Sequence, residues 1–287
     1  MKKILLVWSK WMLASDFSKY FWNNFDIIWM DKDRLDITDL DKAYKKVNLI
    51  RPDIILNLAA YTDVENAEKL WNKMNYEVNA IGVYNLAKIS KELGVDLITI
   101  STDYVFDGTQ KKWYNENNVP MPTNQYGMAK YIWEKLAKSE NKNVIIIRTS
   151  WLYGWGMKFK NFVNTITELA KKKKELKVIN DQFWNPTYTK DLSEAIVKII
   201  GSIRKYRGKI FHFSNTTKWN GISWFDFSKE ILKLNKINIK LIPSRSDEFP
   251  TKAQRPKYSK LLNNSDIKLK KWQDWLSKYI HLIRTWI

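Results

Sequence analysis

The chain has 287 residues, with 15 Trp, 9 Gly and no Cys, so tryptophan outnumbers glycine. This length allows one large domain or two small ones, and 45% hydrophobic residues exclude a disordered chain. The absence of Cys excludes a disulfide scaffold and thiolate chemistry. With only two His, a His-based metal site or a Ser-His-Asp hydrolase is a poor candidate, so we expect no metal site.

The formal net charge of +19 is spread along the chain. Lys, Asn and Ile make up about a third of the residues, and their AT-rich codons offer genome composition as a cause of the basic balance. Nucleic-acid binding is the rival interpretation, but no recognition module accompanies the charge, so we expect no nucleic-acid partner. A basic surface favours anionic small ligands such as nucleotides.

No apolar run reaches the ~18 residues that a membrane-spanning helix needs, so we expect no membrane partner. Residues 2–8 begin with two lysines and continue as an apolar run, which superficially looks like a signal peptide. They lack a long apolar region and a small-residue cleavage site, and they are typical of a buried first strand. We therefore expect a cytoplasmic location.

The first half of the chain alternates short apolar runs with helical patterns. Strands are predicted at 4–7, 26–30, 53–57, 95–100 and 144–147. Helices are predicted through Phe17 and Tyr20, over 75–93 and over 124–139. Strands separated by helices indicate βαβ units, and thus an α/β fold with a Rossmann-type doubly wound parallel sheet.

After Arg148 the alternation loosens, which predicts a second, smaller domain. We expect residues 1–150 to form a dinucleotide-binding Rossmann domain and residues 151–287 to form mainly a substrate-binding domain. A segment over about 188–213 is expected to return to the Rossmann domain. The helices predicted here cover 162–172, 189–203, 223–234 and 272–283, and the strands cover 176–179, 209–213 and 239–242.

The turn after the first predicted strand is where a dinucleotide pyrophosphate would bind. Trp8, Trp11 and Ala14 have the spacing of a G-x-x-G-x-x-G loop, whose glycines allow the tight turn, the approach of the pyrophosphate and helix packing. An indole at 8 or 11 would fill the space that the pyrophosphate needs. Asp31 ends the second strand, where an acid would bind the adenosine ribose; a solvated strand end is the alternative.

Tyr126 and Lys130 place a phenol and an ammonium on one face of a predicted helix, one turn apart. The ammonium would lower the phenol pKa from about 10, and the tyrosine could then protonate a carbonyl that is being reduced by hydride. Context selects this pair because Thr102 ends the fourth predicted strand, at the ligand-binding edge of the sheet. The same spacing recurs in two incidental pairs, Tyr84/Lys88 and Tyr131/Lys135.

Several motifs together carry a family resemblance. They include Ser-Thr-Asp-Tyr-Val-Phe-Asp-Gly at 101–108, Tyr-Gly-x-x-Lys at 126–130 and Arg-Thr-Ser-Trp-Leu-Tyr-Gly at 148–154. Four further segments extend the match, at 57–64, 78–80, 180–187 and 255–261. As a set they resemble the dTDP-4-dehydrorhamnose reductases, which are extended short-chain dehydrogenase/reductases, over nearly the whole chain.

The resemblance implies that Tyr126 is the general acid, with Lys130 as its partner and a ligand of the nicotinamide ribose. It implies that Thr102 bonds the substrate carbonyl region and that Asp103 and Trp151 contact the sugar nucleotide. The structural alternatives are a turn cap for Asp103 and a core position for Trp151. The cofactor-binding residues that it implies, beside Tyr126 and Lys130, are Trp8, Ser9, Lys10, Trp11, Met12, Leu13, Asp31, Asp36, Ile37, Ala59, Ala60, Tyr61 and Thr62.

The reaction implied is reduction of the C4 ketone of dTDP-4-dehydro-L-rhamnose to dTDP-L-rhamnose, a precursor of cell-surface polysaccharide, by NADPH or NADH. The related 4,6-dehydratases carry Asp-Glu after the catalytic Thr, whereas Asp103-Tyr104 follows here, which favours simple carbonyl reduction. Asp31 favours NAD, but Lys32 and Arg34 could accept a 2′-phosphate. The cofactor preference therefore stays open, and so does a homodimer.

Ten of the tryptophans stand where the family pattern or a turn favours glycine. With glycine at all ten the chain would hold 19 Gly, an ordinary share of about 7%. We hypothesise that the source reads UGA as glycine and that the sequence was translated with UGA as Trp. The ten positions are Trp8, Trp11, Trp133 and Trp184 and, less firmly, Trp22, Trp29, Trp71, Trp113, Trp155 and Trp219.

The alternative is that Trp8 and Trp11 are real. The chain would then be a catalytically inactive family member acting as a regulatory or binding subunit, like the regulatory β subunit of methionine adenosyltransferase, which resembles these reductases. The joint presence of Thr102, Tyr126 and Lys130 argues against such decay. The family accepts Trp at three other positions, Trp151, Trp224 and Trp272.

Overall fold

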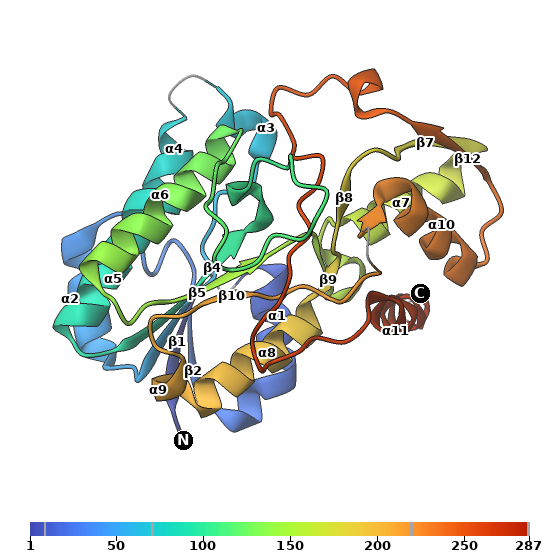
Figure 1. Ribbon diagram of the computed structural model, residues 1–287. Helices are drawn as coiled ribbons and strands as arrows, with labels where there is room; N and C mark the ends of the chain where they lie inside the picture. Colours follow the sequence, from blue (N-terminus) through green and yellow to red (C-terminus); the bar gives the residue numbers. More distant parts are fainter. Residues whose placement is uncertain (9, 70–71, 219–220, 286–287) are drawn as a thin grey trace.

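The fold is organised around a six-stranded parallel sheet (Figure 1). A computed structural model describes residues 1–8, 10–69, 72–218 and 221–285. The strand order is β10-β5-β4-β3-β1-β2, so the chain reverses its direction of travel between β1 and β3. The predicted Rossmann-type fold is confirmed. The strands are β1 Lys3–Val7, β2 Asp26–Met30, β3 Ile54–Asn57, β4 Asp96–Thr102, β5 Ile145–Thr149 and β10 Ile210–His212.

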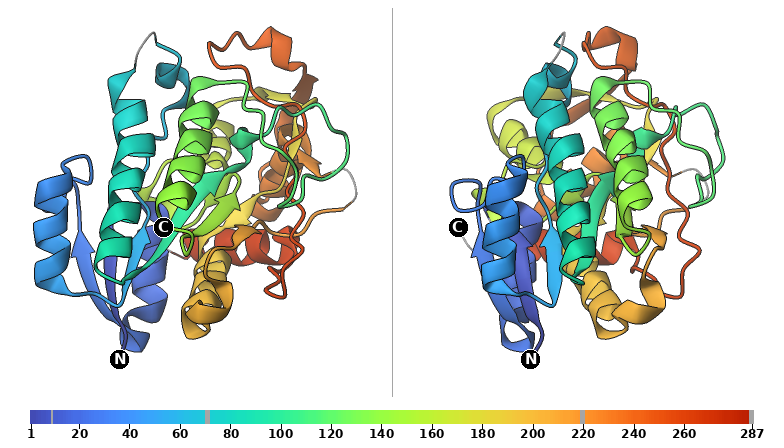
Figure 2. Two further views of the ribbon diagram at one scale, coloured as in Figure 1. Left: turned by 60° about the vertical axis from the view of Figure 1, so that its left-hand side comes forward. Right: turned by 90° about the vertical axis from the view of Figure 1, so that its left-hand side faces the viewer.

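Both faces of the sheet are covered by helices, as Figure 2 shows. Alternate strand residues point to opposite faces, so Leu6 and Leu56 enter one apolar core while Leu5 and Ile55 enter the other. The first core is closed by α1 Met12–Phe21 and α8 Thr189–Gly201. The second is closed by α2 Leu40–Ile50, α5 Gly82–Glu92 and α6 Gln125–Glu140.

The helical pattern predicted over 75–93 is one continuous helical stretch with a wide turn inside it. It consists of α4 Lys73–Tyr76, a π-helical segment Glu77–Ile81 and α5. Asn79 lies in the π segment, accepts a hydrogen bond from the Tyr61 N–H (3.1 Å) and donates one to the Tyr61 carbonyl (2.9 Å). The wide turn thereby holds the loop that follows β3.

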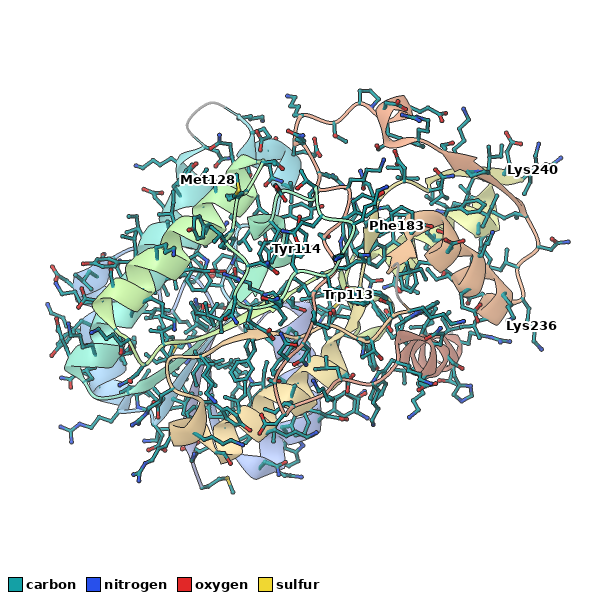
Figure 3. All side chains as sticks on the ribbon, in the orientation of Figure 1. Trp113, Tyr114, Met128, Phe183, Lys236 and Lys240 are labelled. Atoms are coloured by element: carbon teal, nitrogen blue, oxygen red, sulfur yellow. The ribbon has the colours of Figure 1, made fainter. Side chains whose placement is uncertain are left out.

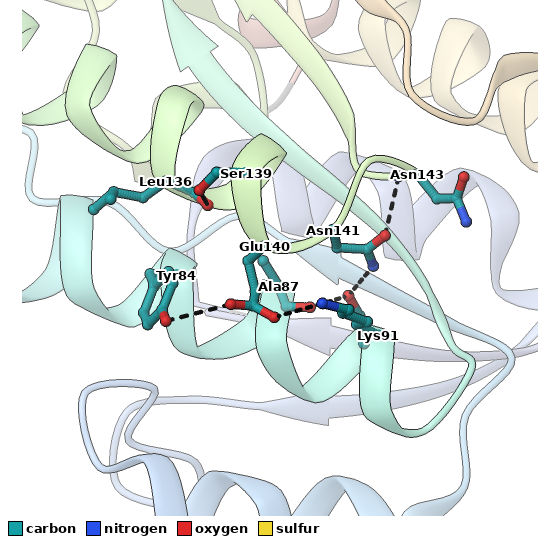
Figure 4. A network of polar contacts seen from close by, with 9 residues as sticks. Tyr84, Ala87, Lys91, Leu136, Ser139, Glu140, Asn141 and Asn143 are labelled. Carbon is teal, nitrogen blue, oxygen red and sulfur yellow. Dashed lines mark hydrogen bonds and ion pairs between the residues drawn. The ribbon is translucent and has the colours of Figure 1, made fainter.

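Polar contacts fix the far ends of α5 and α6 against each other (Figure 4). Glu140 accepts from the Tyr84 hydroxyl (3.3 Å) and pairs with Lys91 (3.1 Å). Asn141, which follows α6, donates to Ser90 on α5 (2.8 Å). The opposite end of α6, which carries Tyr126, therefore stays at the carboxyl edge of the sheet.

The C-terminal part has its own core of aromatic and aliphatic side chains. Its helices are α7 Phe162–Lys172, α10 Trp224–Asn235 and α11 Trp272–Arg284. Three two-stranded pairs accompany them, namely β7 Glu175–Ile179 with β12 Lys240–Ser244, β8 Phe183–Trp184 with β11 Ile222–Ser223, and β6 Leu152–Tyr153 with β9 Thr187–Tyr188.

A late segment of the chain returns to join the two parts. The Tyr114 N–H donates to the Lys260 carbonyl and the Ser259 N–H donates to the Phe183 carbonyl, at 2.8 and 2.9 Å. Tyr114 lies on the loop after β4 and Phe183 begins β8 (Figure 3). Residues 257–262 are therefore held between elements that are far apart in the sequence.

Most predicted elements are present to within a few residues, and the differences have local causes. Helix α2 was not predicted, although six of its eleven residues are hydrophobic and Leu40, Ala43 and Val47 have helical spacing. The Asp39 side chain caps it by accepting from the Lys42 N–H (3.1 Å). Helix α8 ends at Gly201, and α9 Ile203–Tyr206 follows as a separate turn. The two-residue strands carry too little periodicity for any sequence signal.

The segment 189–212 lies with the N-terminal sheet, because α8 packs on α1 and β10 pairs with β5. The domain boundary at residue 150 remains a prediction. Among the helices of the described residues, none has the length and apolarity to cross a membrane.

Gly127 allows α6 to begin in close contact with the loop after β4. A Cβ at this position would lie 2.1 Å from the Tyr104 carbonyl oxygen, whereas a Cβ at Gly201 would meet nothing within 4 Å. We predict that Gly127→Ala lowers the free energy of unfolding by about 1–3 kcal/mol. Gly201→Ala should leave it unchanged or raise it by up to about 1 kcal/mol. Urea denaturation measures both, and equal stabilities would contradict the packing argument.

Candidate active site

A cavity of about 450 Å³ opens at the carboxyl edge of the sheet, where the strand order reverses. Parallel strands all end at this edge, so residues distant in sequence meet there. Nine predicted site residues line the cavity, and they come from α1, the loop after β3, the end of β4, α6 and the segment after β5. They are Trp11, Met12, Ala60, Thr62, Thr102, Asp103, Tyr126, Lys130 and Trp151.

Tyr126 is placed in the first turn of α6 by a side-chain cap. Asn124 accepts the Gly127 N–H (2.8 Å) and donates to the Gln254 carbonyl (2.9 Å), which ties the helix start to the C-terminal segment. Burial raises the pKa of the Tyr126 phenol, and a hydrogen bond with Thr102 opposes that rise. The phenol is therefore protonated at neutral pH and can act as a proton donor.

Lys130 lies one turn further along α6 and is buried. Burial lowers the pKa of its ammonium to about 7, while the charge of Glu134 opposes this lowering. Its Nζ donates to the Ile100 carbonyl on β4 (3.1 Å). The expected lowering of the Tyr126 pKa by Lys130 is not found, since burial, Thr102 and Asp103 are the influences on that phenol.

A buried ion pair that was not predicted from the sequence lies one helical turn after Lys130, between α6 and β5. Glu134 pairs with Arg148 of β5 (2.6 Å) and accepts from the Ser101 hydroxyl of β4 (2.5 Å). Arg148 also lies 3.3 Å from His212 of β10, whose pKa burial and the arginine charge lower to about 3. The sequence carried a signal for Glu134 alone, which lies four residues after Lys130 on the same helix face, and no local pattern pointed to Arg148.

Asp103 is buried at the cavity wall and bonded within the protein. Its carboxylate accepts from the Ser259 hydroxyl (2.5 Å) and from the Thr102 hydroxyl (3.2 Å). Burial raises its pKa to about 7, against the effect of these hydrogen bonds. Asp103 thus joins the end of β4 to the C-terminal segment, and its substrate contact remains a prediction.

Trp151 has the packed position that was its structural alternative, and its contact with a sugar nucleotide remains a prediction. It lines the cavity, and its ring also packs on Trp224 and Trp184, with centroids 3.6 and 5.1 Å away. The Tyr104 ring meets it edge-on at 6.1 Å. It is therefore a wall of the cavity and part of the core of the C-terminal part.

Other predicted cofactor residues lie away from the cavity lining. Lys10 and Asp31 pair with each other (2.6 Å), and this contact lowers the pKa of Asp31. The Asp36 carboxylate accepts from Thr38 on its own turn. Trp8 packs partly into the second core, Leu13, Ile37 and Ala59 are buried in the two cores, and Tyr61 is held by Asn79. Ser9 lies outside the described residues.

Charged residues that were not predicted line the same cavity. Arg255 pairs with Glu65 (3.0 Å), and its buried Nε has no hydrogen-bond partner within the part of the chain that the structure describes. Lys160 adds a second cation to the lining. Arg255 belongs to a motif that carried the family resemblance, but its spacing alone gave it no role. The cavity therefore combines a proton donor with two further cations, and the carboxylates of Asp63 and Glu65 line it as well.

A Tyr and a Lys one turn apart, with a Thr at the carboxyl edge of a doubly wound sheet, define an extended short-chain dehydrogenase/reductase. The family described as RmlD substrate binding domain matches residues 1–285, and the chain belongs to it. The family membership expected from the motifs is thus confirmed.

Relatives cover most of the chain. The Bacillus subtilis (strain 168) spore coat polysaccharide biosynthesis protein SpsK is 35% identical over 261 residues, 89% of this chain and 88% of that protein. The dTDP-4-dehydrorhamnose reductase of Aggregatibacter actinomycetemcomitans is 33% identical over 270 residues, 89% of each chain. The crystal structure of the Bacillus anthracis str. Ames reductase of the same name, in complex with NADP, has a TM-score of 0.90 at 35% identity, covering 98% of this chain and 99% of that one.

Glu134 should be essential for stability because it compensates a buried arginine. We predict that Glu134→Gln lowers the free energy of unfolding by about 3 kcal/mol, since Arg148 is left buried without its counter-charge. Glu140→Gln on the same helix removes a surface pair and should cost at most about 1 kcal/mol. Urea denaturation compares the two, and equal losses would show that the buried pair has no special role.

Asp103 should make stability depend on pH. Its pKa is about 7 in the folded chain and 3.8 in the unfolded chain. Between these two pH values the carboxyl is protonated in the folded state but not in the unfolded state. The stability that Asp103 contributes therefore falls as pH rises from about 4 to about 7. We predict that Asp103→Asn gains roughly 4 kcal/mol of stability relative to the parent across this range. The free energy of unfolding of both proteins is measured by urea denaturation at several pH values. A difference between them that stays constant from pH 4 to pH 7 would refute this prediction.

Proposed function

We propose that this protein reduces the C4 ketone of dTDP-4-dehydro-L-rhamnose to the alcohol of dTDP-L-rhamnose, with NADPH or NADH as hydride donor. The observation that carries the proposal is the convergence of Thr102, Tyr126 and Lys130 on one cavity at the carboxyl edge of the sheet. Relatives bearing the name dTDP-4-dehydrorhamnose reductase support the substrate.

Tyr126 is the proton donor in this reaction. The nicotinamide supplies a hydride to the ketone carbon when it is bound. The Tyr126 phenol gives its proton to the ketone oxygen, and the resulting phenolate is reprotonated from solvent. Thr102 positions the reacting carbonyl through its hydroxyl, which already interacts with Tyr126. The ammonium form of Lys130 stabilises the phenolate. Because the pKa of Lys130 is about 7, the fraction of Lys130 in this form changes most steeply near neutral pH.

The residues present fit the nicotinamide end of the cofactor more readily than its phosphate end. Tyr126 and Lys130 offer hydrogen-bond donors where a nicotinamide ribose would lie. The N-terminus of α1 borders the cavity through Trp11 and Met12, and a helix N-terminus attracts phosphate. Trp11 lines the cavity at this helix N-terminus and packs partly on the first core, so a phosphate bound there would have to share the space with its indole.

Positive charge supports an anionic substrate. Lys160 and Arg255 line the cavity together with the aromatic wall of Trp151. The guanidinium of Arg255, which borders the cavity, would be the donor for a diphosphate oxygen. A homodimer, a cytoplasmic location and the choice between NADPH and NADH remain predictions.

Tyr126→Phe tests the proton donor. It should lower kcat about 10²–10⁴-fold because proton transfer is lost, while the loss of NADPH affinity should be far smaller, because Tyr126 offers only one hydrogen bond toward the nicotinamide ribose. Tyr131→Phe is the matched control, since Tyr131 also precedes a lysine by four residues but does not line the cavity. Oxidation of NADPH with dTDP-4-dehydrorhamnose gives kcat, in the chain as printed and with glycine at 8 and 11. Full activity of Tyr126→Phe would overturn the assignment.

A further inference from the structure

The backbone at Trp8 has a conformation that suits glycine. Its φ of +67° lies in the left-handed region, directly after β1 at the turn toward α1. The turn is held in place, since the Trp8 N–H donates to the Met30 carbonyl (2.7 Å). A side chain with a Cβ costs roughly 1–2 kcal/mol in this region, whereas glycine adopts it freely.

Tryptophan is over-represented among the residues with this backbone conformation. Five non-glycine residues of the described ranges have a positive φ, and three of them are tryptophans although Trp is about 5% of the chain. The other two, Arg51 and Lys236, end helices α2 and α10, where a left-handed residue is common. The three tryptophans follow strands or lie in loops, and they are Trp8, Trp151 and Trp155.

Trp11 has an ordinary backbone conformation, and glycine there is favoured by the ligand that the cavity would hold. Its φ of −117° and ψ of 160° are ordinary for the residue that precedes α1, and its side chain makes no capping hydrogen bond. Trp11 lines the same cavity as Thr102 and Tyr126, and it packs partly on the first core. Glycine is tolerated at a helix N-cap, and it would leave the helix N-terminus open to an anion.

Two buried tryptophans elsewhere carry a related cost. Trp133 and Trp184 are fully buried, and their indole N–H groups have no hydrogen-bond partner among the described residues. A buried donor left unpaired costs about 1–3 kcal/mol. The Trp151 and Trp275 indole N–H groups share this feature, but the Trp151 ring lines the cavity and packs on Trp224, so its side chain has a place there.

We infer that the working form of this protein carries glycine at positions 8 and 11, where it forms the pyrophosphate-binding turn of the cofactor site. Trp155, with a φ of +50° between Gly154 and Gly156, is the next position of the same kind. This inference rests on the proposed function only in the identity of the ligand, a dinucleotide. The codon read as tryptophan at these positions would be one that the source reads as glycine.

The first test needs no activity. Peptide sequencing by mass spectrometry of the protein made in its own source should find glycine at 8 and 11, and the gene should carry UGA at both codons. UGG codons, or tryptophan in those peptides, would overturn the inference. Trp224 is the internal control, since the family accepts Trp there and it should remain tryptophan.

The second test measures cofactor binding. NADPH and NADH are titrated into the chain as printed, into Trp8→Gly/Trp11→Gly and into Trp22→Gly/Trp29→Gly, whose side chains are 60% and 44% exposed and lie outside the cavity. We expect the 8/11 variant to bind at least about tenfold more tightly, a gain of about 1.4 kcal/mol, and the control to match the printed chain. Equal affinity in all three would overturn the inference.

The two proposals fail in distinguishable ways. A Trp8→Gly/Trp11→Gly protein that binds NADPH but does not reduce dTDP-4-dehydrorhamnose would leave the glycine inference standing and refute the substrate. A printed chain that reduces the substrate as fast as the glycine variant would do the reverse. Circular dichroism of each variant confirms that it is folded before either result is read.

Discussion

The buried ion pair between Glu134 and Arg148 is the interaction on which the site depends. It joins α6 to β5, and through Ser101 and His212 it reaches β4 and β10. A buried charge without its partner destabilises the fold. If α6, which carries Tyr126 and Lys130, shifted along the sheet, Arg148 would be left buried without a counter-charge. The charge of the same glutamate also raises the pKa of Lys130, one turn away, and so opposes the lowering caused by burial.

A second constraint acts on the cavity from the C-terminal part. Asp103 directly follows β4 and accepts a hydrogen bond from Ser259, and Asn124 before α6 donates to the Gln254 carbonyl. These bonds hold the segment 254–262 over the sheet edge and bring Arg255 into the cavity. The proton donor and the positive charge for an anionic substrate are thus supplied by different parts of the chain but held by one set of hydrogen bonds.

The tryptophans expose a conflict between the printed sequence and its fold. The sheet, the helices and the catalytic residues agree with one another, as sequences that specify one fold generally do. The disagreement is local and lies in the cofactor turn, where the backbone at Trp8 favours glycine and Trp11 lines the cavity. A protein that had lost its function would not be expected to confine its departures to glycine positions.

The sequence by itself determined the sheet, most helices and the pairing of Tyr126 with Lys130, because apolar periodicity and helical spacing are local properties. It could not find Glu134 with Arg148, or Arg255 in the cavity, since these contacts join residues that only the packed sheet and the returning segment bring together. Only the tertiary structure decided the protonation behaviour of the site. Burial, which no local pattern reveals, sets the pKa values of Tyr126 and Lys130 more strongly than their spacing does.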